Sequence, residues 1–317
     1  MHRLRAETII KSIIASYTFH FLLFFSYLCL YLIENIIKMS KAEKILFITQ
    51  EISPFVPKTE MSLVGRNLPQ AVQETGREIR TFMPKWGTIN ERRNQLHEVI
   101  RLSGMNLIIN DTDHPLIIKV ASIQPARMQV YFIDNDEFFK KRKLTKDKEG
   151  KEYTDNDARA IFYARGVLET VKKLRWSPEI VHCHGWMSAL APLYIKKAFR
   201  EEPSFRESKI VLSIYGEDFE FKEKFDADFK EKLILKGIDQ EDLKSLNNGP
   251  IDYVSLMKFA IDHSDGVIQN SESVNEEVME YARQSGKLIL DYQGTEPADY
   301  TDAFNAFYDK VWESETK

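Results

Sequence analysis

The sequence predicts an α/β protein whose core is a doubly wound, mostly parallel β-sheet with a β-hairpin excursion. Short, almost purely apolar runs such as Lys44–Thr49 are typical of strands that are buried on both faces of a parallel sheet. Along nearly the whole chain these runs alternate with segments of helical periodicity, which is the pattern of successive βαβ units. The 317 residues suffice for one large or two modest domains with a sizeable core.

The first βαβ unit is predicted over residues 44–83. Its first strand leads into a loop that two prolines stiffen, and a helix is then expected over residues 62–74. The apolar positions Leu63, Leu68 and Val72 of this helix are predicted to face inward. A second strand follows the helix and closes the unit.

The next part of the chain changes character. Four short apolar or alternating runs are separated by Gly, Asp and Pro, which predicts a β-hairpin excursion on the edge of the sheet that ends in a return strand. These runs are residues 97–103, 105–110, 115–123 and 128–133.

Two features are expected between the excursion and the next strand. The lysine-rich segment 140–151 is interpreted as a solvated, mobile loop rather than a phosphate-binding patch, because acidic residues interrupt it. Thr154 and Asp157 then have the spacing of a capping box, which predicts a helix from this point to about Leu174.

The second half of the chain continues the alternation of strands and helices. The polar segment 216–250 is interpreted as a lid or partly ordered loop with one helix. The remaining predicted elements are a strand, turn and helix over 178–194, strands at 209–214, 266–270 and 287–290, helices at 252–261 and 273–283, and a helical tail at 298–317.

The N-terminus is the exception to this composition. No Lys, Arg, Asp or Glu occurs from Ser12 to Ile33, and about 20 apolar residues are enough to span a bilayer. No small-residue cleavage site follows, so a signal peptide is not favoured, while Met39 resembles a natural start. Residues 1–38 are therefore either upstream of the true start or a membrane anchor. Residues 39–297 are predicted to form the domain, followed by the helical tail 298–317.

Composition narrows the classes of partner. The net charge of −4 gives no reason to expect a nucleic acid partner. The only two cysteines, Cys29 and Cys183, lie in different contexts, so no disulfide framework is implied and a reducing compartment fits. We expect a cytoplasmic protein, with a membrane as partner only if residues 1–38 are translated.

The strand ending at His182-Cys183-His184 is the first place to look for a site, because ligands of open parallel sheets bind outside the carboxyl ends of the strands. His182 and His184 should share one face of the strand, with Cys183 on the other. Two histidines could bind a metal only with further ligands, and no other His/Cys cluster accompanies them. No metal and no cofactor are predicted; a structural or sugar-facing role is favoured.

Several stretches in this order resemble the N-terminal half of bacterial glycogen synthases and plant starch synthases. They are Ile45-Leu-Phe-Ile-Thr-Gln-Glu-Ile-Ser-Pro, Asn67-Leu-Pro-Gln-Ala, Val130-Tyr-Phe-Ile-Asp-Asn, Tyr153-Thr-Asp-Asn and Pro178-Glu-Ile-Val-His-Cys-His-Gly-Trp, with weaker matches at Ser255-Leu-Met-Lys-Phe-Ala and over 267–278. The resemblance covers about residues 44–296. It implies one Rossmann-like lobe of a two-lobed GT-B glycosyltransferase that transfers glucose from ADP-glucose to an α-1,4-glucan.

The resemblance also implies a set of site residues. Glu51 survives from the catalytic set, and the positions implied in substrate binding are Lys58, Thr59, His182, His184, Trp186 and Lys258. Four residues depart from the family. Glu60 and Met61 stand where the family has the glycines of a phosphate-binding loop, Gly185 replaces an acidic residue, and Tyr215 replaces a histidine that contacts the reacting sugar.

These departures affect the expected activity. Loss of one group that stabilises charge at a transition state commonly costs a factor of ~10²–10³. The second lobe of the family is also not expected within this sequence. As an isolated chain, the protein is predicted to be inactive or a very weak synthase unless a separate lobe completes it.

The alternative is a non-catalytic module that binds glucan or regulates a full-length synthase. The ligands that the resemblance implies are α-glucan or ADP-glucose. Aromatic residues near the strand ends could stack on sugar rings, although core packing is the more common role of such residues. They are Trp86, Trp186, Tyr215 and Phe219.

Overall fold

The computed structural model describes residues 26–27, 41–124, 126–216, 225, 228–246 and 251–314. The chain divides into two units, residues 1–41 and 42–317. In the first unit only residues 26–27, which are helical, and Lys41 are described, so the interpretation of Met39 as a start and nearly all of the segment Ser12–Ile33 lie outside the described residues. No helix in the described ranges combines the length and the apolar character that a bilayer span requires.

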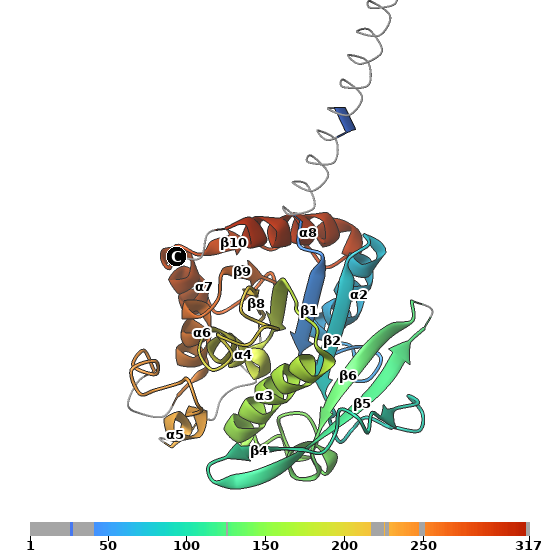
Figure 1. The fold of residues 1–317 in the computed structure, drawn as a ribbon, viewed down its shortest axis with the longest axis vertical. Coiled ribbons are helices and arrows are strands. Elements are labelled where there is room, and N and C mark those ends of the chain that lie inside the picture. The colour runs from blue at the N-terminus through green and yellow to red at the C-terminus, as the bar shows by residue number, and fades with distance from the viewer. Residues whose placement is uncertain are drawn as a thin grey trace, which may run out of the picture. The chain divides into compact units, whose positions relative to one another are not determined.

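A ten-stranded sheet with the order β10-β9-β8-β7-β1-β2-β6-β5-β3 forms the centre of the second unit, with β4 paired to β5 alone (Figure 1). The strands from β10 to β6 are parallel to their neighbours, which confirms the predicted fold class. The bounds are β1 Lys44–Thr49, β2 Glu78–Pro84, β3 His97–Glu98, β4 Met105–Ile109, β5 Thr112–Ile123, β6 Met128–Asp134, β7 Ile180–His184, β8 Lys209–Ile214, β9 Gly266–Gln269 and β10 Leu288–Leu290.

The predicted β-hairpin excursion is confirmed. Strand β5 pairs antiparallel with β6, β4 and β3, and β6 then returns to the sheet parallel to β2. Alternating burial along β5 shows one face on the core and one toward solvent, as expected for an antiparallel edge.

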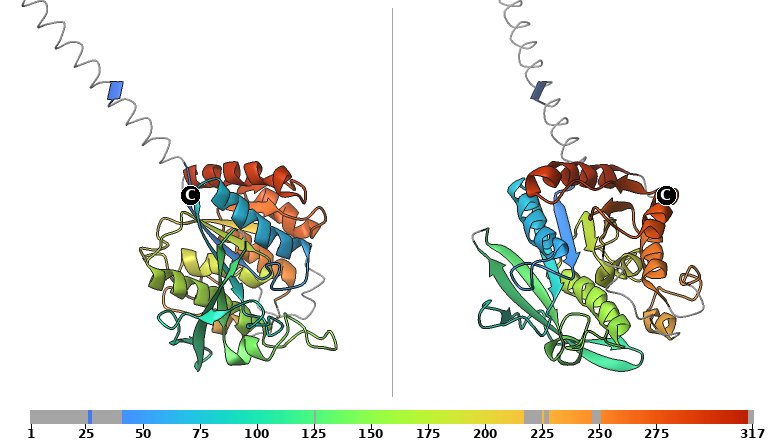
Figure 2. Two further views of the ribbon diagram at one scale, coloured as in Figure 1. Left: turned by 90° about the vertical axis from the view of Figure 1, so that its right-hand side faces the viewer. Right: turned by 180° about the vertical axis from the view of Figure 1, so that it is seen from behind.

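Helices cover both faces of the parallel part of the sheet. Side chains of α2 and α8 pack on one face, and those of α3, α4 and α6 pack on the other (Figures 1 and 2). The helices are α2 Glu60–Glu74, α3 Asn156–Leu174, α4 Ala191–Lys196, α5 Phe229–Leu233, α6 Tyr253–Asp262, α7 Glu276–Gln284 and α8 Pro297–Glu313, with one-turn helices η1 Asp136–Lys140 and η2 Trp186–Ser188.

Burial supports most of the helical faces predicted from periodicity. In α2, Leu68 and Val72 are fully buried, but the prediction for Leu63 is wrong, because this side chain is 38% exposed. Leu63 lies on the solvent side because it is five positions before Leu68, outside the i, i+3, i+4 stripe that Met61, Val64, Leu68 and Val72 form.

The helical tail is part of the core. Tyr300, Phe304, Tyr308 and Val311 of α8 are buried in the same cluster as Phe47 of β1. The tail of the chain therefore covers one face of the sheet rather than extending from it.

Candidate functional site

The sheet reverses its direction of growth between β1 and β7. From β1 the chain adds β2 on one side, and later adds β7, β8, β9 and β10 on the other side. A crevice for ligands forms at such a switch point, beyond the carboxyl ends of the two strands. Thr49 and His184 are neighbours at these ends, so the segments that follow them, from Gln50 and from Gly185, border the candidate site.

The two histidines of β7 lie on one face, as predicted, and both are fully enclosed. The His182 and His184 rings are tilted by 39° with their centroids 3.8 Å apart, and Phe47 lies against both. The two ring nitrogens of His182 are 2.8 Å from the Tyr308 hydroxyl and 2.7 Å from the Ser213 hydroxyl. His182 is therefore fully satisfied within the protein and faces α8 rather than the crevice.

His184 belongs to a second hydrogen-bond chain that reaches the end of β8. Its Nδ1 is 2.8 Å from the Tyr215 hydroxyl, which also accepts a hydrogen bond from the Asn270 side chain. Burial lowers the pKa of His184 to about 3, and burial together with the neighbouring His184 lowers the pKa of His182 well below its usual value. Both imidazoles are neutral at pH 7.

Cys183 lies on the opposite face of β7 among core side chains, as strand geometry predicts. Burial raises the pKa of this thiol, which keeps it protonated and unreactive. The described ranges contain no group of three or more His, Cys, Asp or Glu side chains arranged to hold a metal ion.

The departure at Gly185 has a backbone reason. Gly185 has φ 76° and ψ 170°, a conformation that is essentially restricted to glycine. A carboxylate-bearing residue could not occupy this position without a change in the turn between β7 and η2. The loss of the acidic residue and the shape of the turn are therefore one feature.

The aromatic residues considered for sugar stacking are core residues where they are described. Trp86 and Trp186 are fully buried and Tyr215 is 3% exposed, while Phe219 lies outside the described residues. The Trp86 indole donates to the backbone carbonyl of Gln50 at 2.7 Å, which fixes the segment after β1. Trp186 packs near Phe225, with ring centroids 6.1 Å apart.

The start of α2 lies beside the segment that follows β1, and its own side chains cap it. Thr59 is the N-cap, and Thr59 and Ser62 form a reciprocal capping box. The Thr59 hydroxyl donates to the carboxylate of Glu51, which is 5% exposed. Glu60 is the first helical residue rather than a loop residue, and its carboxylate accepts a hydrogen bond from Ser271, beyond β9.

The two lysines that the resemblance implies lie in different environments. Lys58 is exposed immediately before the cap of α2. Lys258 of α6 pairs with Glu277 of α7 at 2.7 Å, and its ammonium lies 5.3 Å from the centre of the Tyr281 ring. The structure thus brings Glu51 and Thr59 together and directs Lys258 toward α7.

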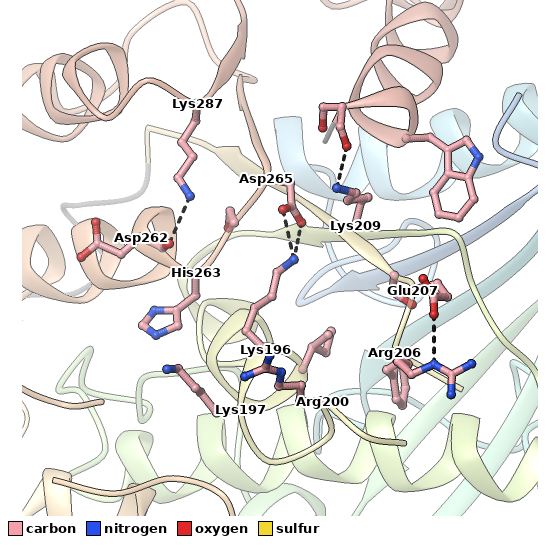
Figure 3. Close-up of a pocket in the computed structure, with 16 residues that line it drawn as sticks. Lys196, Lys197, Arg200, Arg206, Glu207, Lys209, Asp262, His263, Asp265 and Lys287 are labelled. Carbon is pink, nitrogen blue, oxygen red and sulfur yellow. Dashed lines mark hydrogen bonds and ion pairs between the residues drawn. The ribbon is translucent and has the colours of Figure 1, made fainter. Parts of the chain in front are cut away.

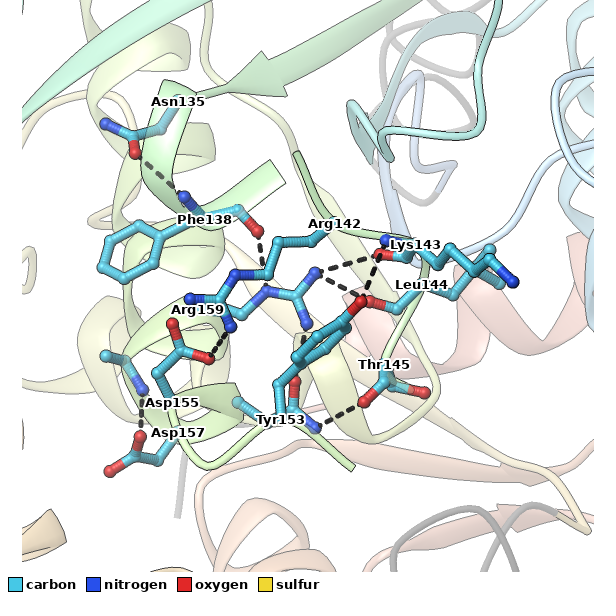
Figure 4. Close-up of polar contacts among 12 residues, drawn as sticks. Asn135, Phe138, Arg142, Lys143, Leu144, Thr145, Tyr153, Asp155, Asp157 and Arg159 are labelled. Atoms are coloured by element: carbon cyan, nitrogen blue, oxygen red, sulfur yellow. Dashed lines mark hydrogen bonds and ion pairs between the residues drawn. The ribbon is translucent and has the colours of Figure 1, made fainter. Parts of the chain in front are cut away.

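A buried arginine that sequence reasoning missed holds the segment before α3 (Figure 4). Arg159 has no exposed surface and donates to the backbone carbonyls of Phe138, Lys143 and Leu144 and to the side chain of Asn156. The Tyr153 ring lies 5.1 Å from the guanidinium carbon. The only sequence signal for a role of Arg159 is that it closely follows the Tyr-Thr-Asp-Asn motif.

This arrangement corrects one prediction and adds detail to another. The capping box at Thr154 is wrong: α3 begins at Asn156 after Asp155, no side chain caps it, and Asp157 pairs with Lys232 at 2.7 Å. Most of the segment 140–151 is accessible to solvent, as predicted, and Arg159 donates to its backbone carbonyls at Lys143 and Leu144.

Comparisons with known proteins agree with this fold. A family model described as starch synthase catalytic domain matches residues 44–290. The glycogen synthase of Pelodictyon phaeoclathratiforme is 30% identical over 279 residues, which cover 86% of this chain and 54% of that protein. The glycogen synthase of Chlorobium luteolum is 38% identical over 174 residues, 55% of this chain and 36% of that protein.

A solved structure has a similar fold. The catalytic domain of starch synthase IV from Arabidopsis thaliana, bound to ADP and acarbose, superposes with a TM-score of 0.64 at 15% identity, covering 79% of this chain and 51% of that one. The chain spans about half the length of the curated relatives that cover most of it. With the family model matched over most of the parallel sheet, the chain belongs to the starch synthase catalytic domain family and is a glycogen and starch synthase-like glycosyltransferase domain.

Proposed function

We propose that this chain is a non-catalytic member of its family, which does not transfer glucose from ADP-glucose on its own and instead binds α-glucan or regulates a full-length synthase. The start of α2 carries the argument. A helix N-terminus at a switch point favours a phosphate, because its free amides and its dipole attract negative charge. Here that end is capped by Thr59 and Ser62 and carries the carboxylate of Glu60.

The charges at the start of α2 should make the binding of a nucleoside diphosphate weak. Glu60 places a carboxylate where the family has a glycine, and the Glu51 carboxylate lies beside the same end of α2, where it accepts from Thr59. Like charges at contact distance repel by about 1 kcal/mol even in bulk water and by more near a protein surface. The hydrogen bond from Ser271 holds the Glu60 carboxylate beside this end of the helix.

Tyr215 and its hydrogen bonds give a second reason to expect no glucosyl transfer. Glucosyl transfer with a nucleotide leaving group depends on groups that stabilise charge and position the acceptor. Tyr215 occupies the position of a family histidine and is engaged by His184 and Asn270 in the core. The side chains of His184, Tyr215 and Asn270 therefore hold the ends of β7, β8 and β9 together.

The test measures transfer of radiolabelled glucose from ADP-glucose to glycogen with the full chain, together with ADP binding by calorimetry. We expect transfer at background and weak ADP binding. Glu60→Gln should tighten ADP binding by about fivefold, as removal of a nearby like charge predicts. Glu74→Gln, the same charge change at the far end of α2, should leave it unchanged. Transfer above background that disappears in Glu51→Ala would overturn the proposal.

The glucan part of the proposal has its own test. The chain should co-sediment with glycogen or be retarded in an amylopectin gel. If neither effect is seen at high glucan concentration, glucan binding is excluded and regulation of a full-length synthase is the remaining role. Regulation requires that adding this chain changes the rate of such a synthase.

A further inference from the structure

A cavity of about 730 Å³ lies at the edge of the sheet opposite the switch point (Figure 3). It is bordered by Lys209 at the start of β8, Asp265 just before β9 and Lys287 just before β10. The amino ends of parallel strands meet at one edge, so this cavity is separate from the crevice at the carboxyl ends. Arg200 and Trp312 complete two of its walls.

Positive charge dominates the lining. The carboxylates are Glu207, Asp262 and Asp265, and the cations are Lys196, Lys197, Arg200, Arg206, Lys209 and Lys287. Six cations against three carboxylates line the cavity, and Asp242 and Glu201, which pair with Lys197 and Arg200 just outside the lining, leave a formal excess of one positive charge. Clustered charge of one sign in a concave surface focuses its field on the cavity and attracts an anion.

The carboxylates are engaged with the protein itself. Asp265 accepts from Lys196 at 2.7 Å and from the backbone amide of Ile210 at 2.7 Å. Asp262 accepts from the Tyr281 hydroxyl at 2.7 Å. These acidic groups therefore stabilise the framework around the cavity and are not available to a cationic ligand.

Two arginines at the cavity remain adaptable. The Arg200 and Arg206 side chains are 77% and 61% exposed, and each pairs with a glutamate that directly follows it in the chain. The Arg200 pair is long, at 3.9 Å. Exposed pairs of this kind contribute little free energy, so both guanidinium groups can turn to a ligand at small cost. A guanidinium matches two oxygens of a phosphate with parallel hydrogen bonds.

The inner part of the cavity favours an anion with an organic body. Lys209 is 7% exposed and donates to the backbone carbonyl of Ser314 at 2.7 Å. Burial lowers the pKa of Lys209, Asp265 opposes this shift and Lys196 adds to it, and a bound anion would act in the same direction as Asp265. Trp312 offers an aromatic surface beside these charges. The volume falls within the range of small-molecule sites.

We propose that this cavity binds a small organic phosphate monoester, with Arg200 and Arg206 on the phosphate and Trp312 along the organic group. A phosphorylated sugar and a nucleoside monophosphate share this chemistry. The proposal is independent of whether the switch-point crevice binds a nucleotide sugar.

The experiment titrates the full chain with glucose 1-phosphate, AMP and inorganic phosphate, and follows the indole N–H signal of Trp312 by NMR, assigned through its loss in Trp312→Phe. We expect this signal to shift with at least one organic phosphate and to respond more weakly to inorganic phosphate. The double variant Arg200→Ala/Arg206→Ala should weaken the binding at least tenfold.

Arg92→Ala/Arg93→Ala is the matched control, because it removes the same charge from two exposed arginines outside the cavity. It should bind as the unchanged protein does. Equal weakening in both double variants would show non-specific attraction and overturn the proposal, as would a Trp312 signal that no ligand moves. Glu60→Gln should leave this binding unchanged, which separates its outcome from that of the crevice.

Discussion

Two neutral histidines lie in contact beneath the switch point, and their hydrogen bonds explain why they are there. His182 joins α8 to β8 through Tyr308 and Ser213, while His184 reaches Tyr215. Satisfied buried polar chains of this kind fix a single arrangement of the core, and an unsatisfied member is costly. The role of both residues in this structure is to connect elements, whatever they contribute to a ligand.

This network predicts a pH-dependent stability. The pKa of His184 is about 3 in the folded chain, and that of an unfolded histidine is near 6.5, so the unfolded chain binds more protons between these values. The contribution of the neutral histidines to the free energy of unfolding should therefore be at its full value above about pH 6.5. It should decrease as the pH falls below about 6.5. For each buried histidine the slope approaches about 1.4 kcal/mol per pH unit.

Urea unfolding at pH 7.5, 6.5 and 5.5 measures this slope before the carboxylates titrate. His184→Asn retains a polar atom at the position of Nδ1 and should give a shallower slope. Asparagine at the exposed His97 should not change it. A slope identical in the unchanged protein and in His184→Asn would contradict the prediction.

The residue scale also shows what one sequence can and cannot supply. Alternation along β7 placed His182 and His184 on one face and Cys183 on the other, because strand geometry is local. The partner of His182 is Tyr308, 126 residues away, and no local pattern indicates such a pair. The positive φ of Gly185 likewise depends on the path of the chain into η2.

At the scale of elements, Arg159 fixes how α3 and the segment before it are joined. Its guanidinium is charged although burial lowers its pKa to about 10, and four acceptors surround it. Arg159→Lys keeps the charge but cannot reach all four acceptors with its single ammonium. We expect the free energy of unfolding to fall by roughly 3 kcal/mol, because buried acceptors lose their donors.

The same variant should make the lysine-rich segment 140–151 more sensitive to trypsin, since Arg159 anchors the carbonyls of Lys143 and Leu144. Arg142→Lys is the control. Its pair with Asp155 is partly exposed, so this change should cost less than about 1 kcal/mol. Unchanged proteolysis in Arg159→Lys would show that the anchor does not hold the segment.

Strands were predicted more accurately than helix starts, for a physical reason. The predicted bounds of β1 and β8 agree with the structure, because a strand buried on both faces needs an uninterrupted apolar run. Helix starts depend on which of several polar residues caps the first turn. Thr59 does so at α2, whereas Thr154 does not at α3, where Asp155 precedes the helix and its side chain makes no hydrogen bond that caps it.

At the scale of the whole molecule, contacts between distant segments decide both the candidate site and the core. Glu60 of α2 meets Ser271 beyond β9, and Arg77 beside β2 pairs with Asp309 of α8 at 2.9 Å. The sequence could indicate the strands and most of the helices, and the family resemblance could place the crevice. It could not show that the end of α2 is closed by Glu60, because that contact spans 211 positions.

Helix α8 lies beyond the residues that the family model matches, yet it is expected to fold as one cooperative unit with the sheet. Phe304 and Tyr308 are buried against β1 and β7, and Tyr308 also satisfies His182. Replacing a buried aromatic residue with alanine typically costs about 3–5 kcal/mol. Phe304→Ala/Tyr308→Ala should therefore remove much of a total stability of roughly 5–15 kcal/mol, even if the two effects are not additive.

Asp302→Ala/Lys310→Ala changes two exposed residues of the same helix and leaves the net charge unaltered, so its urea midpoint should stay close to that of the unchanged protein. In the core double variant the midpoint should fall and amide exchange should accelerate in β1 and β7 together with α8, because removing α8 uncovers the face that Phe47 occupies. If exchange accelerated in α8 alone while the strands kept their protection, α8 would be an independently opening segment, and the single cooperative unit inferred from its buried face would be wrong.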